Sequence, residues 1–240
     1  MSFKNVTQLC KWLHEELEQL PLVRYPFNLQ QLPKNGIYFF YEKDEIWGHG
    51  ENKKRIVRMG THKEGNFRSR IQEHFLLNER KMNFDSMKAA PKDISIFRKN
   101  IGRALLNKQG SPYMKIWNID LTSRRNRERY AHLRKVEYEK EIEKQITSTL
   151  RANFGFRFIR VEDEVWRMGT KGLESRLIGT VTRCSLCHPS NNWLGKYSPK
   201  RKIRESGLWL VQHLESPPID QEDMNFIKIA INKTKTTMLI

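Results

Sequence analysis

Two short apolar runs near the start of the chain constrain its fold more than any other feature. The first, "IYFFY" at residues 37–41, is β-branched and aromatic, and the second, "RIVRMG" at 55–60, is the next β-like run. A polar, glycine-containing stretch separates them. This pattern predicts two antiparallel strands joined by a loop. Apolar residues at helical spacing follow in the segment 67–82 and predict a helix there.

The rest of the chain alternates between helical and strand-like patterns. Leucines and a tryptophan form one stripe over residues 9–20, which predicts an amphipathic helix before a proline-punctuated connector. Asp93 or Ser95 can cap a helix, and a long helix is predicted over 124–154, with a strand at 114–121 between them. A further strand is predicted at 156–161, an amphipathic helix at 171–181, and a last helix after the prolines at 217–218.

The charge balance indicates the class of partner. The chain has 44 Lys and Arg against 27 Asp and Glu, a formal net charge of +17. Such a surplus attracts polyanions and speeds encounter with them, and nucleic acid gains further from counterion release. We therefore expect DNA as the partner, the alternative being a basic surface that binds nothing. Two basic runs, at 98–108 and 122–135, are the predicted contact surfaces.

Cysteine usage and hydropathy favour the cytoplasm. The chain has three cysteines, no apolar stretch of the roughly 20 residues that a membrane span requires, and no signal-peptide pattern. "CSLCH" places Cys184, Cys187 and His188 at the spacing of a haem-attachment motif, which needs export. A four-ligand zinc site would need another Cys/His pair, and Cys10 is the one other cysteine. We expect these residues to be structural, with a zinc half-site completed by another histidine as the alternative.

Several polar side chains converge on the predicted strands. Tyr38 lies on the first strand, and Arg58 and His62 flank the end of the second. Arg70 and His74 are four residues apart, so they share one face of the following helix. Phosphodiester hydrolysis needs a base, a cation for the phosphate and a proton for the leaving oxygen, and it usually needs a carboxylate-held metal ion.

This arrangement resembles the GIY-YIG nuclease family. "GIY" stands at residues 36–38, the second triplet falls at "RMG" (58–60), and the helix pattern stands as Arg68-x-Arg70-x-x-x-His74. The resemblance implies an α+β fold with a small three-stranded antiparallel sheet flanked by helices. We expect a nuclease domain at 34–215 with a large, mainly helical insertion at about 80–160. An N-terminal helix and connector (1–33) and a C-terminal helix and tail (216–240) flank it.

The resemblance also implies an activity, namely DNA cleavage with one divalent cation, Mg²⁺ or Mn²⁺. Tyr38 would activate water, Arg70 would hold the scissile phosphate and His74 would handle the proton. His62 is a further candidate base. The metal ligand would be Glu174, preferred to Glu79, Glu162 and Glu164, and an asparagine, Asn191 or Asn192, would complete the site.

One position departs from the family pattern, because Arg58 replaces the second tyrosine. The change removes a hydroxyl and adds a permanent cation that can bind a phosphate oxygen. Two hypotheses stay open: an active endonuclease, favoured as restriction-like over repair or mobile-element enzymes, and an inactive nucleic-acid-binding protein on the same fold. RNA is a third possibility, and a homodimer is compatible with duplex cleavage. The second "RMGT", at 167–170, is expected to be a coincidence of spelling.

Overall fold

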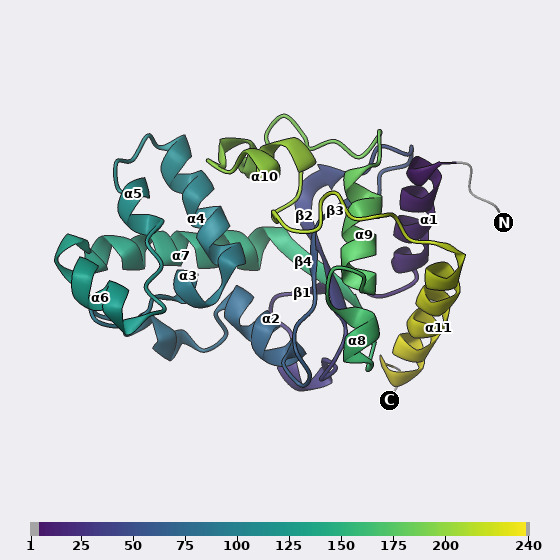
Figure 1. The fold of residues 1–240 in the computed structure, drawn as a ribbon, viewed down its shortest axis with the longest axis horizontal. Coiled ribbons are helices and arrows are strands. Elements are labelled where there is room, and N and C mark those ends of the chain that lie inside the picture. Colours follow the sequence, from purple (N-terminus) through teal and green to yellow (C-terminus); the bar gives the residue numbers. More distant parts are fainter. Residues whose placement is uncertain (1–4, 239–240) are drawn as a thin grey trace.

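The computed structural model describes residues 5–238 and contains a four-stranded sheet with helices on both faces (Figure 1). The strands are β1 (Val23–Arg24), β2 (Ile37–Ile46), β3 (Lys54–Gly60) and β4 (Phe154–Ile159). The α-helices are α1 (Val6–Glu18), α2 (Phe67–Phe75), α3 (Pro91–Ile94), α4 (Ile96–Lys108), α5 (Met114–Trp117), α6 (Arg124–Tyr130), α7 (Val136–Asn153), α8 (Glu164–Arg167), α9 (Leu173–Thr182), α10 (Arg201–Ser206) and α11 (Gln221–Met238). Short 3₁₀ turns are η1 (Leu29–Gln31), η2 (Glu79–Met82), η3 (Ala131–Leu133) and η4 (Leu194–Tyr197).

The sheet has the order β1-β4-β2-β3, and every pairing is antiparallel. The central strand β2 places Tyr38 opposite Gly60 of β3 on one side and opposite Phe158 of β4 on the other. The α+β prediction is confirmed, but the sheet has four strands where three were expected. The additional strand is β1, a two-residue edge formed by the connector where Val23 pairs with Phe156.

The sheet separates two apolar cores, and β2 contributes to both because side chains alternate along a strand. Ile37, Phe39 and Tyr41 face one core, and Tyr38 and Phe40 face the other. Helices α1, α9 and α11 cover the first face, and α2, α4 and α7 cover the second (Figure 1). A strand buried on both faces reads as a continuous apolar run, which explains why "IYFFY" lacks polar alternation.

The helical segment between α2 and β4 forms a lobe on one side of the sheet (Figure 1). Its last helix, α7, runs directly into β4, so the strand next to β2 comes from the end of the predicted insertion. The strand predicted at 114–121 is wrong, because residues 114–117 form helix α5. Trp117 is completely buried there against Gly102, and its indole N–H donates to the carbonyl of Lys99. The helix predicted over 124–154 is divided at 131–135 into α6 and α7.

The basic run at 98–108 is mostly buried, which corrects its prediction as a DNA-contact surface. Arg98 and Arg103 are buried, and Lys99 exposes 6% of its surface. Arg103 donates to the side-chain oxygens of Asn100 and Asn118. The prediction from charge was wrong because these cations bond to acceptors inside the helical lobe. The second run remains accessible at Arg124, Arg125 and Arg129 of α6.

A completely buried ion pair connects the helices of the lobe. Arg98 of α4 and Glu143 of α7 are both completely buried, with 2.6 Å between Nη2 and Oε2. Arg98 also donates to the carbonyl of His74 on α2, and Glu143 accepts the backbone N–H of Lys92. The pair therefore connects α2, α3, α4 and α7. Within residues 5–238, no helix is long and apolar enough to cross a lipid bilayer.

We predict that Arg98→Met destabilises the protein by about 3–5 kcal/mol, because it leaves the buried carboxyl of Glu143 without its cation. Urea unfolding followed by circular dichroism measures the loss. The matched control is Arg124→Met, whose partner Glu128 is exposed, and this change should leave the unfolding free energy nearly unchanged. Equal effects of the two substitutions would contradict the assignment.

Candidate active site

Tyr38 and His74 meet at the face of the sheet covered by α2. The tyrosine hydroxyl lies 3.2 Å from His74 Nε2, and the two rings are edge to face. Gly60, opposite Tyr38 on β3, makes this contact possible. A Cβ at position 60 would lie 2.3 Å from the tyrosine oxygen, closer than any unstrained contact. The "GIY" tyrosine and the "RMG" glycine therefore fit together as one packing unit.

A serine continues the hydrogen-bonded chain behind His74. The Nδ1 atom of His74 lies 2.8 Å from Ser95 Oγ, and Ser95 also caps α4 by accepting the N–H of Arg98. Burial, aided by the charges of Arg58 and Arg70, holds the pKa of His74 well below its ordinary value. The imidazole is therefore neutral at pH 7. One ring nitrogen donates and the other accepts, so Tyr38, His74 and Ser95 form a continuous proton path.

Glu174 reaches the same strand from the other face, in the first turn of α9. Its Oε1 atom accepts the backbone N–H of Thr61 at 3.1 Å, immediately after Gly60. Its Oε2 atom accepts no hydrogen bond from any residue within 5–238. Burial raises the pKa of Glu174 to about 7, against the opposing effects of the Thr61 N–H, Arg58 and Arg167. A half-buried carboxylate with one free oxygen can bind a cation.

Arg58 lies near both His74 and Glu174 and is a buried cation without a carboxylate partner among the described residues. It exposes 7% of its surface, donates to the Trp209 carbonyl at 2.5 Å and stacks on the Phe97 ring at 4.8 Å. Its Nε atom is buried and has no hydrogen-bond partner. The arginine that replaces the family tyrosine thus adds unneutralised positive charge between the two halves of the site.

His62 and Arg70 lie at the margin of this group. The Nη1 atom of Arg70 donates to Glu73 Oε2 at 2.5 Å and to the carbonyl of Ile94. Burial, together with the charge of Arg70, lowers the pKa of His62. The guanidinium of Arg167 donates to the His62 carbonyl at 3.0 Å. The second "RMGT" segment therefore contacts the residue that follows the first, a contact that the sequence did not indicate.

The asparagine prediction has no contact to support it. Asn192 is exposed, and Asn191 is exposed and accepts from Lys196. Neither contacts Glu174 in the described part of the chain, and their role stays a prediction. The alternative glutamates are engaged elsewhere: Glu79 pairs with Arg151, Glu162 accepts from Asn35, and Glu164 accepts the N–H of Glu64.

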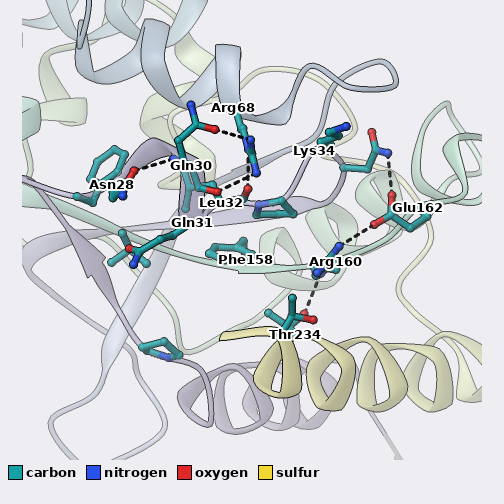
Figure 2. A pocket seen from close by; sticks show the side chains of 16 residues that line it. Asn28, Gln30, Gln31, Leu32, Lys34, Arg68, Phe158, Arg160, Glu162 and Thr234 are labelled. Carbon is teal, nitrogen blue, oxygen red and sulfur yellow. Dashed lines mark hydrogen bonds and ion pairs between the residues drawn. The ribbon is translucent and has the colours of Figure 1, made fainter. Parts of the chain in front are cut away.

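A cavity of about 810 Å³ lies apart from the Tyr38–His74 pair and Glu174, between the connector, β4 and α11 (Figure 2). None of the predicted site residues lines it. Figure 2 shows that Arg68, the first basic residue of the helix pattern, donates to Gln30 and to the Leu32 carbonyl. Arg68 therefore fastens the connector to α2 and is occupied in that structural role.

Comparison with known proteins decides the family. The model of the GIY-YIG domain matches residues 3–237, nearly the whole chain. The protein belongs to the GIY-YIG family. No curated protein and no solved structure matches it. The GIY-YIG match includes both terminal helices and the helical lobe, so these elements lie within the region that the family model describes.

Three contributors to the GIY-YIG site were not identified from the sequence as such: Thr61, Ser95 and Arg167. For Ser95 the sequence contained partial information, since it predicted this residue as a possible helix cap. A cap residue can also bond a neighbouring helix, but its partner depends on how α4 packs on α2. Thr61 acts through its backbone N–H, which any residue supplies, so no sequence signal exists for it.

We predict that Gly60→Ala destabilises the protein by about 1–3 kcal/mol, because the new methyl group overlaps the Tyr38 hydroxyl. Chemical denaturation measures the change. In a Tyr38→Leu background the same substitution should cost clearly less, since the shorter side chain leaves room for the methyl. Additive costs in this double-mutant cycle would show that the two positions do not compete for space.

Proposed function

We propose that the protein is a metal-dependent DNA endonuclease. The observation that carries the proposal is the meeting of three groups around the end of β3: the Tyr38–His74 pair, the free oxygen of Glu174 and the unpaired cation of Arg58. These groups supply a base, a metal ligand and a cation that can bind the phosphate. Phosphodiester hydrolysis requires all three. The net charge of +17 supports DNA as the substrate.

Tyr38 and His74 are assigned to proton transfer. The neutral His74 accepts a hydrogen bond from the tyrosine hydroxyl or donates one to it, and its second ring nitrogen is hydrogen-bonded to Ser95. A tyrosine has a pKa of about 10 in water, so it needs help to accept a proton from an attacking water at pH 7. A neutral imidazole at hydrogen-bond distance, with Arg58 nearby to stabilise negative charge, provides that help.

Glu174 is assigned as the ligand of one divalent cation, Mg²⁺ or Mn²⁺. Mg²⁺ commonly takes one or two carboxylates, with waters and phosphate oxygens completing its shell. A single half-buried carboxylate with a free Oε2 atom fits that donor set. When bound, the cation would stabilise charge on the phosphate and acidify a bound water. The Thr61 N–H holds the other carboxylate oxygen and so fixes the orientation of the group.

Arg58 and Arg70 are assigned to the scissile phosphate. Arg58 has a buried Nε atom without a partner, and Arg70 uses only Nη1 in its contacts with Glu73 and Ile94. Exposed cations on α6 and α10, among them Arg125, Arg201 and Lys202, are suited to the DNA backbone. We favour a restriction-like role, with two copies acting on the two strands of a duplex.

A second candidate is a DNA-binding protein without catalysis. The observation that favours it is the burial of Tyr38, which exposes 2% of its surface. Packing around its ring comes from Phe40, Phe67 and His74. Under this alternative, the tyrosine and histidine hold β2 to α2, and Arg58 serves only to bind phosphate.

We predict that the wild-type protein cleaves DNA in Mg²⁺ or Mn²⁺ and that both Tyr38→Phe and Glu174→Ala lower the rate by about a hundredfold or more. Loss of a proton-transfer group costs at least about 10²-fold, and a bound cation contributes several kcal/mol. Relaxation and linearisation of supercoiled plasmid, together with cutting of linear duplex, measure the rate.

The controls are Tyr197→Phe, an exposed tyrosine, and Glu162→Ala, one of the glutamates not chosen. Both should cut at the wild-type rate. Full activity of Glu174→Ala would show that the catalytic metal ion is not bound by this residue of α9. Binding of plasmid by the wild type without cleavage, in either metal, would establish the binding-only alternative, and reversion by Arg58→Tyr would then test whether the arginine caused the loss.

We predict that the Mg²⁺ concentration giving half the maximal rate rises as pH falls below about 7. Glu174 has a pKa raised to about 7, so only about a tenth of the carboxyl is ionised one unit lower. Protons and Mg²⁺ then compete for the same oxygen, and the midpoint should be about tenfold higher at pH 6 than at pH 8. Mg²⁺ titrations of the cleavage rate at pH 6 and pH 8 test this. Equal midpoints would exclude Glu174 as the ligand.

A further inference from the structure

Three cysteines and a histidine converge at the end of the sheet away from Glu174. The ligand atoms of Cys10, His49, Cys184 and Cys187 all lie within 4.8 Å of one another. Cys10 lies on α1, His49 lies in the loop between β2 and β3, and the other two cysteines follow α9. These segments are far apart in the sequence, while α1 and α9 lie side by side (Figure 1).

The distances match a tetrahedral zinc site. With Zn–S bonds of about 2.3 Å and a Zn–N bond of about 2.0 Å, two sulfurs stand about 3.8 Å apart, and a sulfur and a nitrogen about 3.5 Å. The Sγ atoms of Cys10 and Cys187 are 3.9 Å apart, and His49 Nε2 lies 3.3 Å from Cys184 Sγ. One ion at the centre would reach all four atoms.

The loops around the cluster are shaped to hold it. Backbone N–H groups of Leu186 and Cys187 bond the Cys184 sulfur, and the N–H of Gly48 bonds the Cys187 sulfur. Gly48 lies so close to the turn between the cysteines that a Cβ would stand 1.8 Å from the Leu186 carbonyl oxygen. The hairpin loop and the Cys184–Cys187 turn therefore pack against each other.

Neighbouring histidines do not compete for the position. His14 Nε2 accepts the N–H of Ile56, so its Nδ1 carries the proton and donates to the Cys10 carbonyl at 2.9 Å. His188 of "CSLCH" is exposed and lies against the Ser185 carbonyl. The same Nδ1 atom of His14 lies 3.6 Å from Cys10 Sγ, but its proton points to the carbonyl. His49 is the histidine that brings an uncommitted ring nitrogen to the sulfurs, at Cys184. A disulfide is also absent among the described cysteines, since all three thiols are free.

We propose that Cys10, His49, Cys184 and Cys187 form a closed structural zinc site. Three thiolates and an imidazole select zinc, and four protein ligands leave no position for water or substrate. The site would join α1, the β2–β3 loop and the end of α9. Glu174 lies in the first turn of α9 and Cys184 lies just beyond its last, which separates the two positions by about 15 Å. The zinc site is thus distinct from the nuclease site, and this proposal does not depend on the proposed function.

The test is the metal content of the protein purified without chelators. We expect one zinc per chain by plasma mass spectrometry, and visible d–d bands of tetrahedral cobalt after exchange with Co²⁺. His49→Ala should lower zinc affinity at least about tenfold in competition with a chromogenic chelator. The matched control is His188→Ala, which replaces an exposed histidine that lies against the Ser185 carbonyl and is not a proposed ligand. This variant should keep one equivalent of zinc. His49 is partly exposed, so its replacement leaves the core intact.

Removal of zinc gives an independent readout. A strong chelator should lower the melting temperature of the wild type, and His49→Ala should lose its zinc at a lower chelator concentration than the wild type. Alkylation after chelation should modify three thiols per chain. Iron in place of zinc, a disulfide linking Cys10 and Cys187 by mass spectrometry, or a protein that neither contains nor takes up zinc would each overturn the proposal. Loss of zinc in His188→Ala, with retention in His49→Ala, would overturn the ligand assignment.

Discussion

The close approach of Tyr38 to Gly60 determines how the rest of the site is arranged. The antiparallel register sets the two residues opposite each other, and the missing Cβ lets the tyrosine hydroxyl lie over β3. From there the hydroxyl reaches His74 on α2, whose position is fixed by Ser95 and by Arg98 through the His74 carbonyl. A shift of one residue in register would turn Tyr38 to the opposite core and dissolve the chain of contacts.

The central strands and the helix that follows them could be predicted from local sequence patterns. Strand β2, strand β3 and helix α2 were readable because their apolar spacing and their turn residues lie within about 40 residues of one another. Strand pairing of β1 was not readable, since a two-residue edge acquires its identity only from β4. The 114–121 segment has strand-like composition, but the space beside Gly102 accepts Trp117 from a helix. Tertiary packing overrode propensity there.

The positions of charged residues in the sequence did not predict which of them are buried and which are exposed. Arg98, Lys99 and Arg103 look like a nucleic-acid surface in the sequence, yet each has partners within the helical lobe. Arg58 is the reverse case: the sequence placed it among the candidate site residues, but it did not predict that the arginine is buried. Its lack of a carboxylate partner among the described residues is visible only in three dimensions. Buried cations need a compensating anion, so an unpaired one next to a free carboxylate oxygen is suited to a phosphate or a metal-bound phosphate.

Helix α9 connects two chemically different ends of the molecule. Its first turn carries Glu174, the proposed oxygen ligand, and the proposed sulfur ligands Cys184 and Cys187 follow its last turn. Hard cations prefer the first donor type and zinc prefers the second, so the two ends discriminate between metals by ligand softness. The sequence offered only half of the sulfur cluster, because Cys10 and His49 come near it solely through the packing of α1 and the hairpin loop. Fixing the exit of α9 to α1 and β3 also restrains its first turn, which is where the Glu174 carboxylate must keep its place beside Thr61.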